Sequence, residues 1–329
     1  MHPATRREIL QMMAAGLALG AKAHAAQQPS PGGVPTRPFG KTGEKLSIIC
    51  LGGWDIGAVK DDAEAVAIMQ EAADEGINFF DNCWEYHKGR SEELMGKALA
   101  EGGRRDKVFL MTKVCARDYA RAKQHLDDSL RRLKTDRIDL WQFHGIRWDE
   151  DAGLIFDEKH GACRAALEAR EAGKVRHIGF TGHKDPKFHL DMLARPFAWA
   201  SVQMPLNILD PHYHSFQREV LPKCVERGIP VLAMKSLAAQ KGRIPRELPF
   251  TAEICRRYAL SLPICSLVCG MMSRKDLLQD LAIARNFQPM TGAELADLVA
   301  RSKEFGTDGH VEQYKIVDYG CSWSRKNPQ

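Results

Sequence analysis

Short apolar runs alternate along the chain with longer segments whose apolar residues recur every three to four positions. The short runs are rich in β-branched residues, and several, such as residues 108–111, are continuously apolar, as is typical of strands buried on both faces. The longer segments have the period of amphipathic helices. Strands are predicted at residues 47–52, 78–82, 108–114, 138–144, 175–181, 200–205, 230–235 and 266–270.

A helix is expected after each strand, and several of these segments end at a glycine, the residue that most often terminates a helix. Eight successive β-then-α units predict an α/β fold of the (β/α)8 TIM-barrel type. An open doubly wound sheet is the main alternative, but it commonly has a Gly-x-Gly-x-x-Gly turn after its first strand, and residues 51–54 lack that spacing. The helices are predicted at residues 62–75, 91–101, 118–133, 159–172, 186–194, 215–227, 252–260 and 273–286.

Additional segments are expected at both ends of the barrel, which we place at residues 37–329. Residues 36–47 have the pattern of a short hairpin around Gly40 and Gly43, and residues 287–329 are predicted to form an extra helix and an irregular tail. Residues 26–36 are rich in Pro, Gly, Gln and Ser and are interpreted as a linker.

The first 25 residues have the order of features found in an export signal. Arg6 and Arg7 precede an apolar run at residues 9–21, and Ala23-His24-Ala25 matches a cleavage pattern. The run is too short to span a bilayer of roughly 30 Å as a helix. The arginine pair resembles the twin-arginine type, which is a targeting address and not an anchor. We therefore expect the twin-arginine machinery to export an already folded protein to the periplasm, without a stable membrane anchor; a simple amphipathic N-terminus is the alternative.

Composition and charge narrow the function classes. The chain has 329 residues, 44% hydrophobic and 27% charged, which is ordinary for a soluble, core-forming protein. Removal of residues 1–25 takes away three basic residues and one acidic residue, so the net charge falls from +5 to +3, too small a bias to indicate nucleic-acid binding. The nine cysteines are scattered and odd in number. They are interpreted mostly as buried small hydrophobes, and no metal-binding set is expected.

Four polar residues of different type stand where predicted strands end. Asp81 ends the second strand, Tyr86 follows five residues later, Lys113 lies near the end of the third, and His144 ends the fourth. In a (β/α)8 barrel the C-terminal ends of the strands meet on one face, where catalytic residues lie. Taken singly, Asp81 could cap a turn and His144 could be an ordinary core histidine. The hypothesis of a catalytic group therefore depends on all four residues occurring together.

These four residue types suit proton transfer to a carbonyl oxygen. Tyrosine has an ordinary pKa near 10 and is a weak acid at neutral pH. A nearby ammonium is expected to lower that pKa, and a carboxylate beside the lysine would keep the lysine charged and in place. A neutral histidine can donate a hydrogen bond that orients the substrate oxygen. The tyrosine could then protonate the alkoxide that forms when hydride reaches the carbonyl carbon.

The segment at residues 80–92, FDNCWEYHKGRSE, resembles the signature of the aldo-keto reductase family, in which Asp and Tyr stand five apart and Gly-x-Ser-Glu follows. Lys113 and His144 complete the family's tetrad, and the resemblance extends over about residues 37–280. It implies an NAD(P)(H)-dependent oxidoreductase that reduces an aldehyde or ketone to an alcohol, or catalyses the reverse. Tyr86 would be the general acid, Lys113 and Asp81 would tune it, and His144 would orient the carbonyl.

The resemblance also implies cofactor contacts, and NADP(H) is expected over NAD(H). Asn207 stands near the position where many members have a tyrosine that stacks on the nicotinamide, which is a departure from the family pattern. Asp276 would repel the 2′-phosphate that distinguishes NADP(H). The residues implied in cofactor binding are Thr181, Gly182, His183, Gln203, Asn207, Lys235, Ser236, Gly270, Ser273, Arg274, Gln279 and Asp280.

The substrate pocket is expected to be apolar, with the tetrad at its floor and Trp54, Asp55, Trp84 and Trp148 as candidate walls. Two other functions remain open. One is a catalytically slow nicotinamide-binding regulatory protein, which resembles the potassium-channel β-subunits. The other is an unrelated metal-dependent barrel hydrolase, which would need more histidines and carboxylates at the strand ends than the sequence offers there.

Overall fold

The computed structural model describes residues 33–239 and 242–317. The expected export signal, most of the expected linker and the end of the expected tail lie outside the described residues. None of the helices in the described ranges is both long enough and apolar enough to cross a membrane.

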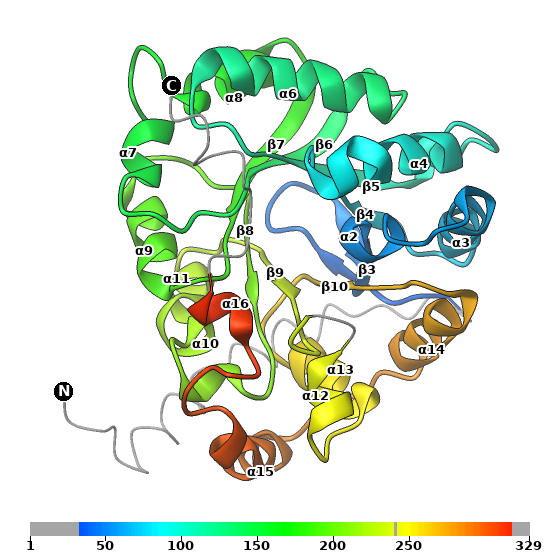
Figure 1. Ribbon diagram of the computed structural model, residues 1–329, viewed down its shortest axis with the longest axis vertical. Helices are drawn as coiled ribbons and strands as arrows, with labels where there is room; N and C mark the ends of the chain where they lie inside the picture. Colours follow the sequence, from blue (N-terminus) through cyan, green and yellow to red (C-terminus); the bar gives the residue numbers. More distant parts are fainter. Residues whose placement is uncertain (1–32, 240–241, 318–329) are drawn as a thin grey trace.

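Eight parallel strands close into a barrel in the order β10-β3-β4-β5-β6-β7-β8-β9, which confirms the predicted (β/α)8 fold (Figure 1). Their residues are almost all buried, because the helices cover one face of each strand and the barrel interior covers the other. The strands are β3 (Ile49–Gly52), β4 (Phe79–Asp81), β5 (Phe109–Val114), β6 (Ile138–Phe143), β7 (Val175–Thr181), β8 (Ser201–Pro205), β9 (Val231–Met234) and β10 (Ser266–Cys269).

The helices surround this barrel (Figure 1). Close packing between α4 and α6 requires a glycine, because a Cβ at Gly96 would lie 2.2 Å from the carbonyl oxygen of Arg132. The helices that follow the strands are α3 (Asp62–Asp74), α4 (Arg90–Leu99), α6 (Tyr119–Arg132), α8 (Ala162–Glu171), α9 (Pro186–Ala194), α10 (Phe216–Glu219), α11 (Leu221–Glu226), α13 (Ala252–Ser261) and α14 (Arg274–Arg285). Shorter helices are α2 (Gly53–Ile56), η1 (Tyr86–Gly89), α5 (Arg104–Lys107), α7 (Asp151–Ile155), η2 (Asp210–His212) and α12 (Arg243–Glu247).

The single helix predicted at residues 215–227 was wrong. The structure has two helices there, α10 and α11, with Val220 between them. Pro222 lies in the first turn of α11, where its missing N–H costs nothing; inside one continuous helix it would remove a hydrogen bond.

The predicted hairpin at residues 36–47 is present, and the structure shows that it closes the N-terminal end of the barrel. Strands β1 (Thr36–Pro38) and β2 (Lys45–Ser47) pair antiparallel. Phe39 and Leu46 pack with Phe79 and Phe109 in a small apolar cluster. This plug leaves the opposite end of the barrel, where the strands terminate, as the end that can hold a site.

After α15 (Gly292–Ser302) and η3 (Lys303–Phe305), the chain returns to the strand ends through α16 (Gln313–Ile316), drawn in red in Figure 1. Buried charges hold it there: the Lys315 ammonium lies 2.8 Å from Asp210 and 2.9 Å from Glu312. Asn207 also donates to the Tyr314 hydroxyl at 3.0 Å. The segment at residues 312–315, expected to be irregular, therefore forms part of the barrel mouth.

Candidate active site

The four residues singled out from the sequence come together at the C-terminal ends of neighbouring strands. Asp81 is the last residue of β4, and Tyr86 begins η1 in the loop that follows. Lys113 lies on β5, and His144 comes directly after β6. The ring centroids of Tyr86 and His144 are 5.7 Å apart, with the rings nearly perpendicular.

Lys113 is the centre of this group. Its buried ammonium forms an ion pair with the Asp81 carboxylate, donates to the carbonyl oxygen of Asn82 at 2.7 Å, and lies 3.3 Å from the Tyr86 hydroxyl. The same nitrogen lies 4.9 Å from the centre of the Tyr86 ring. One lysine thus holds a carboxylate, a backbone carbonyl and a phenol in fixed relation.

Burial sets the protonation states of the tetrad. It raises the pKa of Tyr86 well above the ordinary value, and the Asp81, Glu85 and Asp55 carboxylates add to this. The net direction is opposite to the lowering expected from the lysine alone, so the free site holds a protonated tyrosine. Burial and the Lys113 ammonium lower the pKa of His144 well below its ordinary value, which keeps that ring neutral. Burial also raises the pKa of Asp81, an effect partly offset by Lys113.

The Gly-x-Ser-Glu part of the signature holds the tyrosine loop in place. Ser91 donates to the carbonyl oxygen of Gly53 at 2.6 Å, and Arg90 donates to that of Val59 at 2.8 Å. The buried Glu92 accepts from Thr112 at 2.6 Å and lies 3.3 Å from Arg132. These contacts tie α4 to the loop after β3 and to β5, so they support Tyr86 without touching it.

The surroundings of His144 were not anticipated from the sequence. Its Nδ1 lies 3.2 Å from the Cys83 sulfur, 3.5 Å from the Cys115 sulfur and 3.7 Å from a Glu85 oxygen. Burial raises the pKa of Glu85 to about 7, against the opposing effect of Arg147. The sequence signal was weak, because cysteines 32 positions apart have no recognisable spacing.

The residues expected around a nicotinamide lie next to the tetrad. Gln203, on β8, hydrogen bonds with Asp81, whereas its buried Oε1 has no hydrogen-bond partner. Thr181 ends β7, Gly182 follows it, and the His183 ring lies 5.8 Å from that of Tyr314. A buried acceptor without a partner is costly, so Gln203 Oε1 is suited to a ligand donor such as a carboxamide.

The Asn207 side chain is buried and hydrogen-bonded within the protein. It donates to Glu312 at 2.8 Å and to the Tyr314 hydroxyl at 3.0 Å. The aromatic ring in this region is therefore that of Tyr314, which arrives from the C-terminal segment and lies 5.3 Å from the Lys235 ammonium. Sequence reasoning missed Tyr314 because it stands more than 100 residues away from Asn207.

A chain of buried and partly buried charged residues lies on the side where a pyrophosphate was expected. The Asp55 carboxylate lies against Gly270, where a Cβ would approach it to 2.2 Å. Asp55 interacts with Lys235 and Arg256. Burial lowers the pKa of Lys235 to about 8, although Asp55 opposes this change. Arg256 in turn donates to Ser236 at 2.9 Å.

Three of the residues expected near the adenosine, Asp280, Ser273 and Arg274, already have partners within the protein. Asp280 forms a two-pronged ion pair with Arg256, at 3.0 and 3.1 Å. Ser273 caps α14 by accepting from the Asp276 N–H at 3.2 Å, and the exposed Arg274 pairs with Glu71 at 2.8 Å. Gln279 is exposed on α14. Both carboxylate oxygens of Asp280 therefore accept from Arg256 in the protein without nucleotide.

The candidate wall residues divide into two groups. The Trp54 ring lies 5.3 Å from the Tyr86 ring and is 55% exposed, so it stands at the mouth of the site. The Trp84 ring instead stacks on His125 of α6 at 3.5 Å. Trp148 lies farther along the loop after β6, with the Lys184 ammonium 5.1 Å from its ring.

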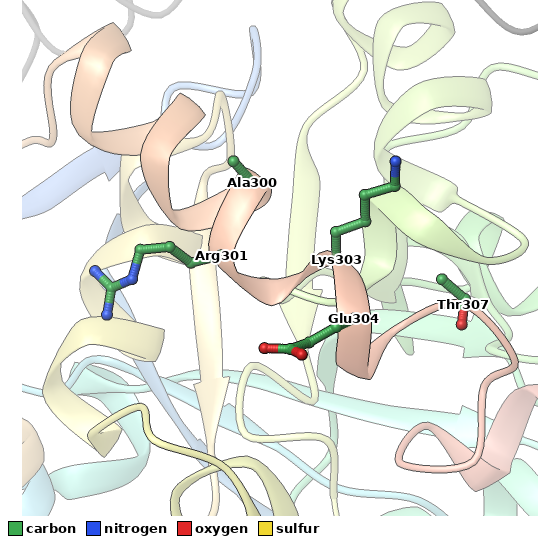
Figure 2. Close-up of a pocket in the computed structure, with 5 residues that line it drawn as sticks. All are labelled: Ala300, Arg301, Lys303, Glu304 and Thr307. Atoms are coloured by element: carbon green, nitrogen blue, oxygen red, sulfur yellow. The ribbon is translucent and has the colours of Figure 1, made fainter.

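A separate surface pocket lies beside the end of α15 and η3 and contains none of the expected site residues (Figure 2). Its lining residues are Ala300, Arg301, Lys303, Glu304 and Thr307.

Comparison with known proteins identifies the family of the chain. The model of the "Aldo/keto reductase family" matches residues 48–247. The chain is 31% identical over 268 residues to the "Uncharacterized oxidoreductase YrpG" of Bacillus subtilis, covering 72% of this chain and 79% of that protein. It is 37% identical over 273 residues to a "Probable voltage-gated potassium channel subunit beta" of Arabidopsis thaliana, covering 74% and 79%.

Solved structures share the fold. The holo form of the aldo-keto reductase AKR11C1 from Bacillus halodurans superimposes with a TM-score of 0.67 at 24% identity, covering 80% of this chain and 96% of that one. An aldo/keto reductase from Klebsiella pneumoniae in complex with NADP and acetate gives a TM-score of 0.63 at 22% identity, covering 79% and 92%.

Proposed function

The chain belongs to the aldo/keto reductase family, and we propose that it is an NADPH-dependent reductase that converts an aldehyde or ketone to an alcohol, or catalyses the reverse. The observation that carries this proposal is the position of the Lys113 ammonium, which lies 3.3 Å from the Tyr86 hydroxyl and is paired with Asp81. The phenol is protonated in the free site, and the fixed ammonium beside it can stabilise the phenolate that remains after the proton has been transferred.

NADPH, when bound, supplies the hydride. The protein's own residues manage the oxygen and the proton. Neutral His144 donates a hydrogen bond that orients the carbonyl oxygen, and Tyr86 donates its proton to that oxygen as negative charge develops. Lys113 stabilises the phenolate that remains, and Asp81 holds Lys113. In the oxidative direction Tyr86 takes the proton back.

The residues fit the nicotinamide end of the cofactor well. Gln203 Oε1 is buried without a partner and can accept from a carboxamide. Lys235 is a partly buried cation on the pyrophosphate side, and Arg274 and Lys275 are exposed at the start of α14, where they can reach a 2′-phosphate. These cations favour NADPH over NADH in the proposal.

A slow, regulatory nicotinamide-binding protein is the second candidate. The specific observation in its favour is the Asp55 carboxylate, which interacts with Lys235 and Arg256 and so places negative charge on the pyrophosphate side. The similarity to the Arabidopsis channel subunit is consistent with this alternative. Turnover, and not nucleotide binding, distinguishes the two functions.

The test is the oxidation of NADPH and of NADH with a simple aromatic aldehyde by the wild-type protein and by Tyr86→Phe. The proposal expects wild-type turnover and a loss of roughly a hundredfold or more in kcat for the variant. Tyr119→Phe is the matched control, because it removes the same hydroxyl from the start of α6, where it bonds Glu168 at 2.7 Å. Nucleotide binding without turnover would instead support the regulatory function.

The place of action is proposed from the N-terminal sequence alone. The Arg6-Arg7 pair, the apolar run and the Ala23-His24-Ala25 pattern support export of the folded protein to the periplasm with its cofactor already bound. Fractionation of cells expressing the full chain and its Arg6→Lys/Arg7→Lys variant tests this: the wild type should be periplasmic and carry nucleotide, and the variant should stay in the cytoplasm.

A further inference from the structure

The residue that follows the tyrosine of the tetrad has a strained backbone. His87 has φ 51° and ψ 40°, and Lys88 after it has φ 59° and ψ 34°. This left-handed conformation is uncommon for residues with a Cβ, whereas glycine adopts it freely. Strain of this kind collects at functional sites, where other contacts compensate for it. The His87 side chain is therefore expected to make contacts that a glycine could not make.

The His87 ring makes three contacts with α2 and the residue that ends it. Because a carbonyl oxygen only accepts, the Nε2 of His87 carries a proton and donates it to the Trp54 carbonyl at 2.7 Å. The His87 ring also packs on the Trp54 ring, with the centroids 4.7 Å apart and the planes inclined at 34°. At Gly57 a Cβ would lie 2.6 Å from His87 Cδ2, so the ring lies close against the backbone there. His87 thus holds both the main chain and the indole of Trp54.

Trp54 is held in this way beside the proposed proton donor. Its ring centroid lies 5.3 Å from that of Tyr86, and the two planes are inclined at 81°. The Trp54 side chain is nevertheless exposed at the mouth of the site, whereas most large apolar side chains of the described residues are buried. A ligand that covers such a ring gains a large apolar contact. The indole is therefore an uncovered apolar surface, fixed in position next to Tyr86.

We propose that His87 is a specificity-determining positioning residue, which holds the Trp54 indole so that it packs against the ring of an aromatic aldehyde or ketone at Tyr86. Aromatic rings attract one another in offset-stacked or edge-to-face arrangements, so the energy of the contact depends on a fixed orientation. His87 acts through Trp54 and touches neither the substrate nor the reacting atoms. This inference rests on the proposed function, because the substrate it describes is the carbonyl compound that Tyr86 protonates.

The experiment compares benzaldehyde with propanal, which has no ring to pack on the indole. In His87→Gly the KM for benzaldehyde should rise about three- to tenfold, the value of one aromatic contact. The KM for propanal and both kcat values should change little, because the reacting atoms keep their partners. Trp54→Leu should have the same effect, and adding His87→Gly to Trp54→Leu should raise the KM no further, since both substitutions remove one contact.

Lys88→Gly is the matched control. Lys88 has the same left-handed backbone and an exposed side chain, so its replacement gives the loop the same freedom without touching Trp54. This variant should have the KM values of the wild type. Equal losses in the two glycine variants would overturn the proposal, because loop rigidity alone would then explain them. An unchanged His87→Gly, or one that loses benzaldehyde and propanal equally, would also overturn it.

A binding measurement separates this proposal from the proposed function. Benzyl alcohol does not react in the absence of a cofactor, and its binding to the full chain can be followed by nuclear magnetic resonance. It should bind the wild type and Lys88→Gly alike and His87→Gly more weakly; equal binding to all three proteins, or binding to none, contradicts the proposal. If the wild type reduces neither aldehyde, the proposed function fails, and the binding of benzyl alcohol still decides whether His87 and Trp54 form an aromatic site.

Discussion

The Lys113 ammonium lies 3.3 Å from the Tyr86 hydroxyl while it forms an ion pair with Asp81. The two residues stand 27 positions apart and come from different strand ends. Because Lys113 is buried and Tyr86 is partly buried beside it, the lysine connects the stability of the barrel mouth to the acidity of the phenol, and changes to either should affect both.

Lys113→Met should destabilise the protein as well as inactivate it. The substitution leaves Asp81 as a buried carboxylate without its cation, a situation that costs about 3–5 kcal/mol. Urea unfolding followed by circular dichroism measures the loss. The double variant Asp81→Leu/Lys113→Met should recover most of the stability but none of the activity, and equal stability of the single variant and the wild type would contradict the buried pair.

Nucleotide binding should weaken as the pH rises through about 8, because the pKa of Lys235 is lowered to about 8. Below that pH Lys235 is charged and can attract a pyrophosphate, and above it the charge is lost in the free protein. The Kd for NADPH should therefore be flat at lower pH and rise above about pH 8. Lys235→Arg keeps its charge and should remove the rise; identical profiles for the two proteins would exclude Lys235 from the nucleotide site.

Asp55→Asn should tighten NADPH binding. The Asp55 carboxylate interacts with Lys235 and Arg256, and its removal takes away a negative charge that an incoming pyrophosphate would meet. The gain should be about 1 kcal/mol, roughly fivefold in Kd. The measurement belongs well below pH 8, because loss of Asp55 also lowers the pKa of Lys235 further. Asp62→Asn, on the exposed start of α3, is the control and should bind NADPH as the wild type does.

Lys315→Met should loosen the C-terminal segment. Lys315 is buried between Asp210 and Glu312, and its loss leaves two carboxylates facing each other without a cation. A destabilisation of about 3–5 kcal/mol is expected, together with faster proteolysis near residue 312. Lys303→Met, exposed on η3, should change neither. A Lys315→Met protein as stable and as protease-resistant as the wild type would show that the segment is held by other contacts.

The architecture could be predicted from the sequence in unusual detail. Strands such as β5 and β6 are continuously apolar because both of their faces are buried, and that pattern is local. Because eight strands alternate with helices along the chain, few fold topologies are compatible with the sequence. The break between α10 and α11 was missed because the apolar period continues through Pro222, and the proline fits as the start of a second helix.

The tetrad could also be located from the sequence, since Asp81, Lys113 and His144 each stand where a strand ends. In a closed parallel barrel the C-terminal ends of all the strands meet on one face. Residues at the ends of different strands can therefore be predicted to lie near one another. The net pKa direction of Tyr86 could not be predicted in the same way, because it depends on how completely the ring is buried and on carboxylates from other loops.

The sequence by itself thus determined the barrel, the hairpin that precedes it and the four residues at the strand ends, all of which follow from periodicity and from strand position. Only the tertiary structure decided which side chains meet across the barrel mouth. Tyr314 lies beside Asn207, Asp55 lies against Gly270, and Cys83 joins Cys115 at His144. These pairs are brought together by barrel closure and by the return of the C-terminal segment, and no local pattern encodes contacts between residues so far apart in the chain.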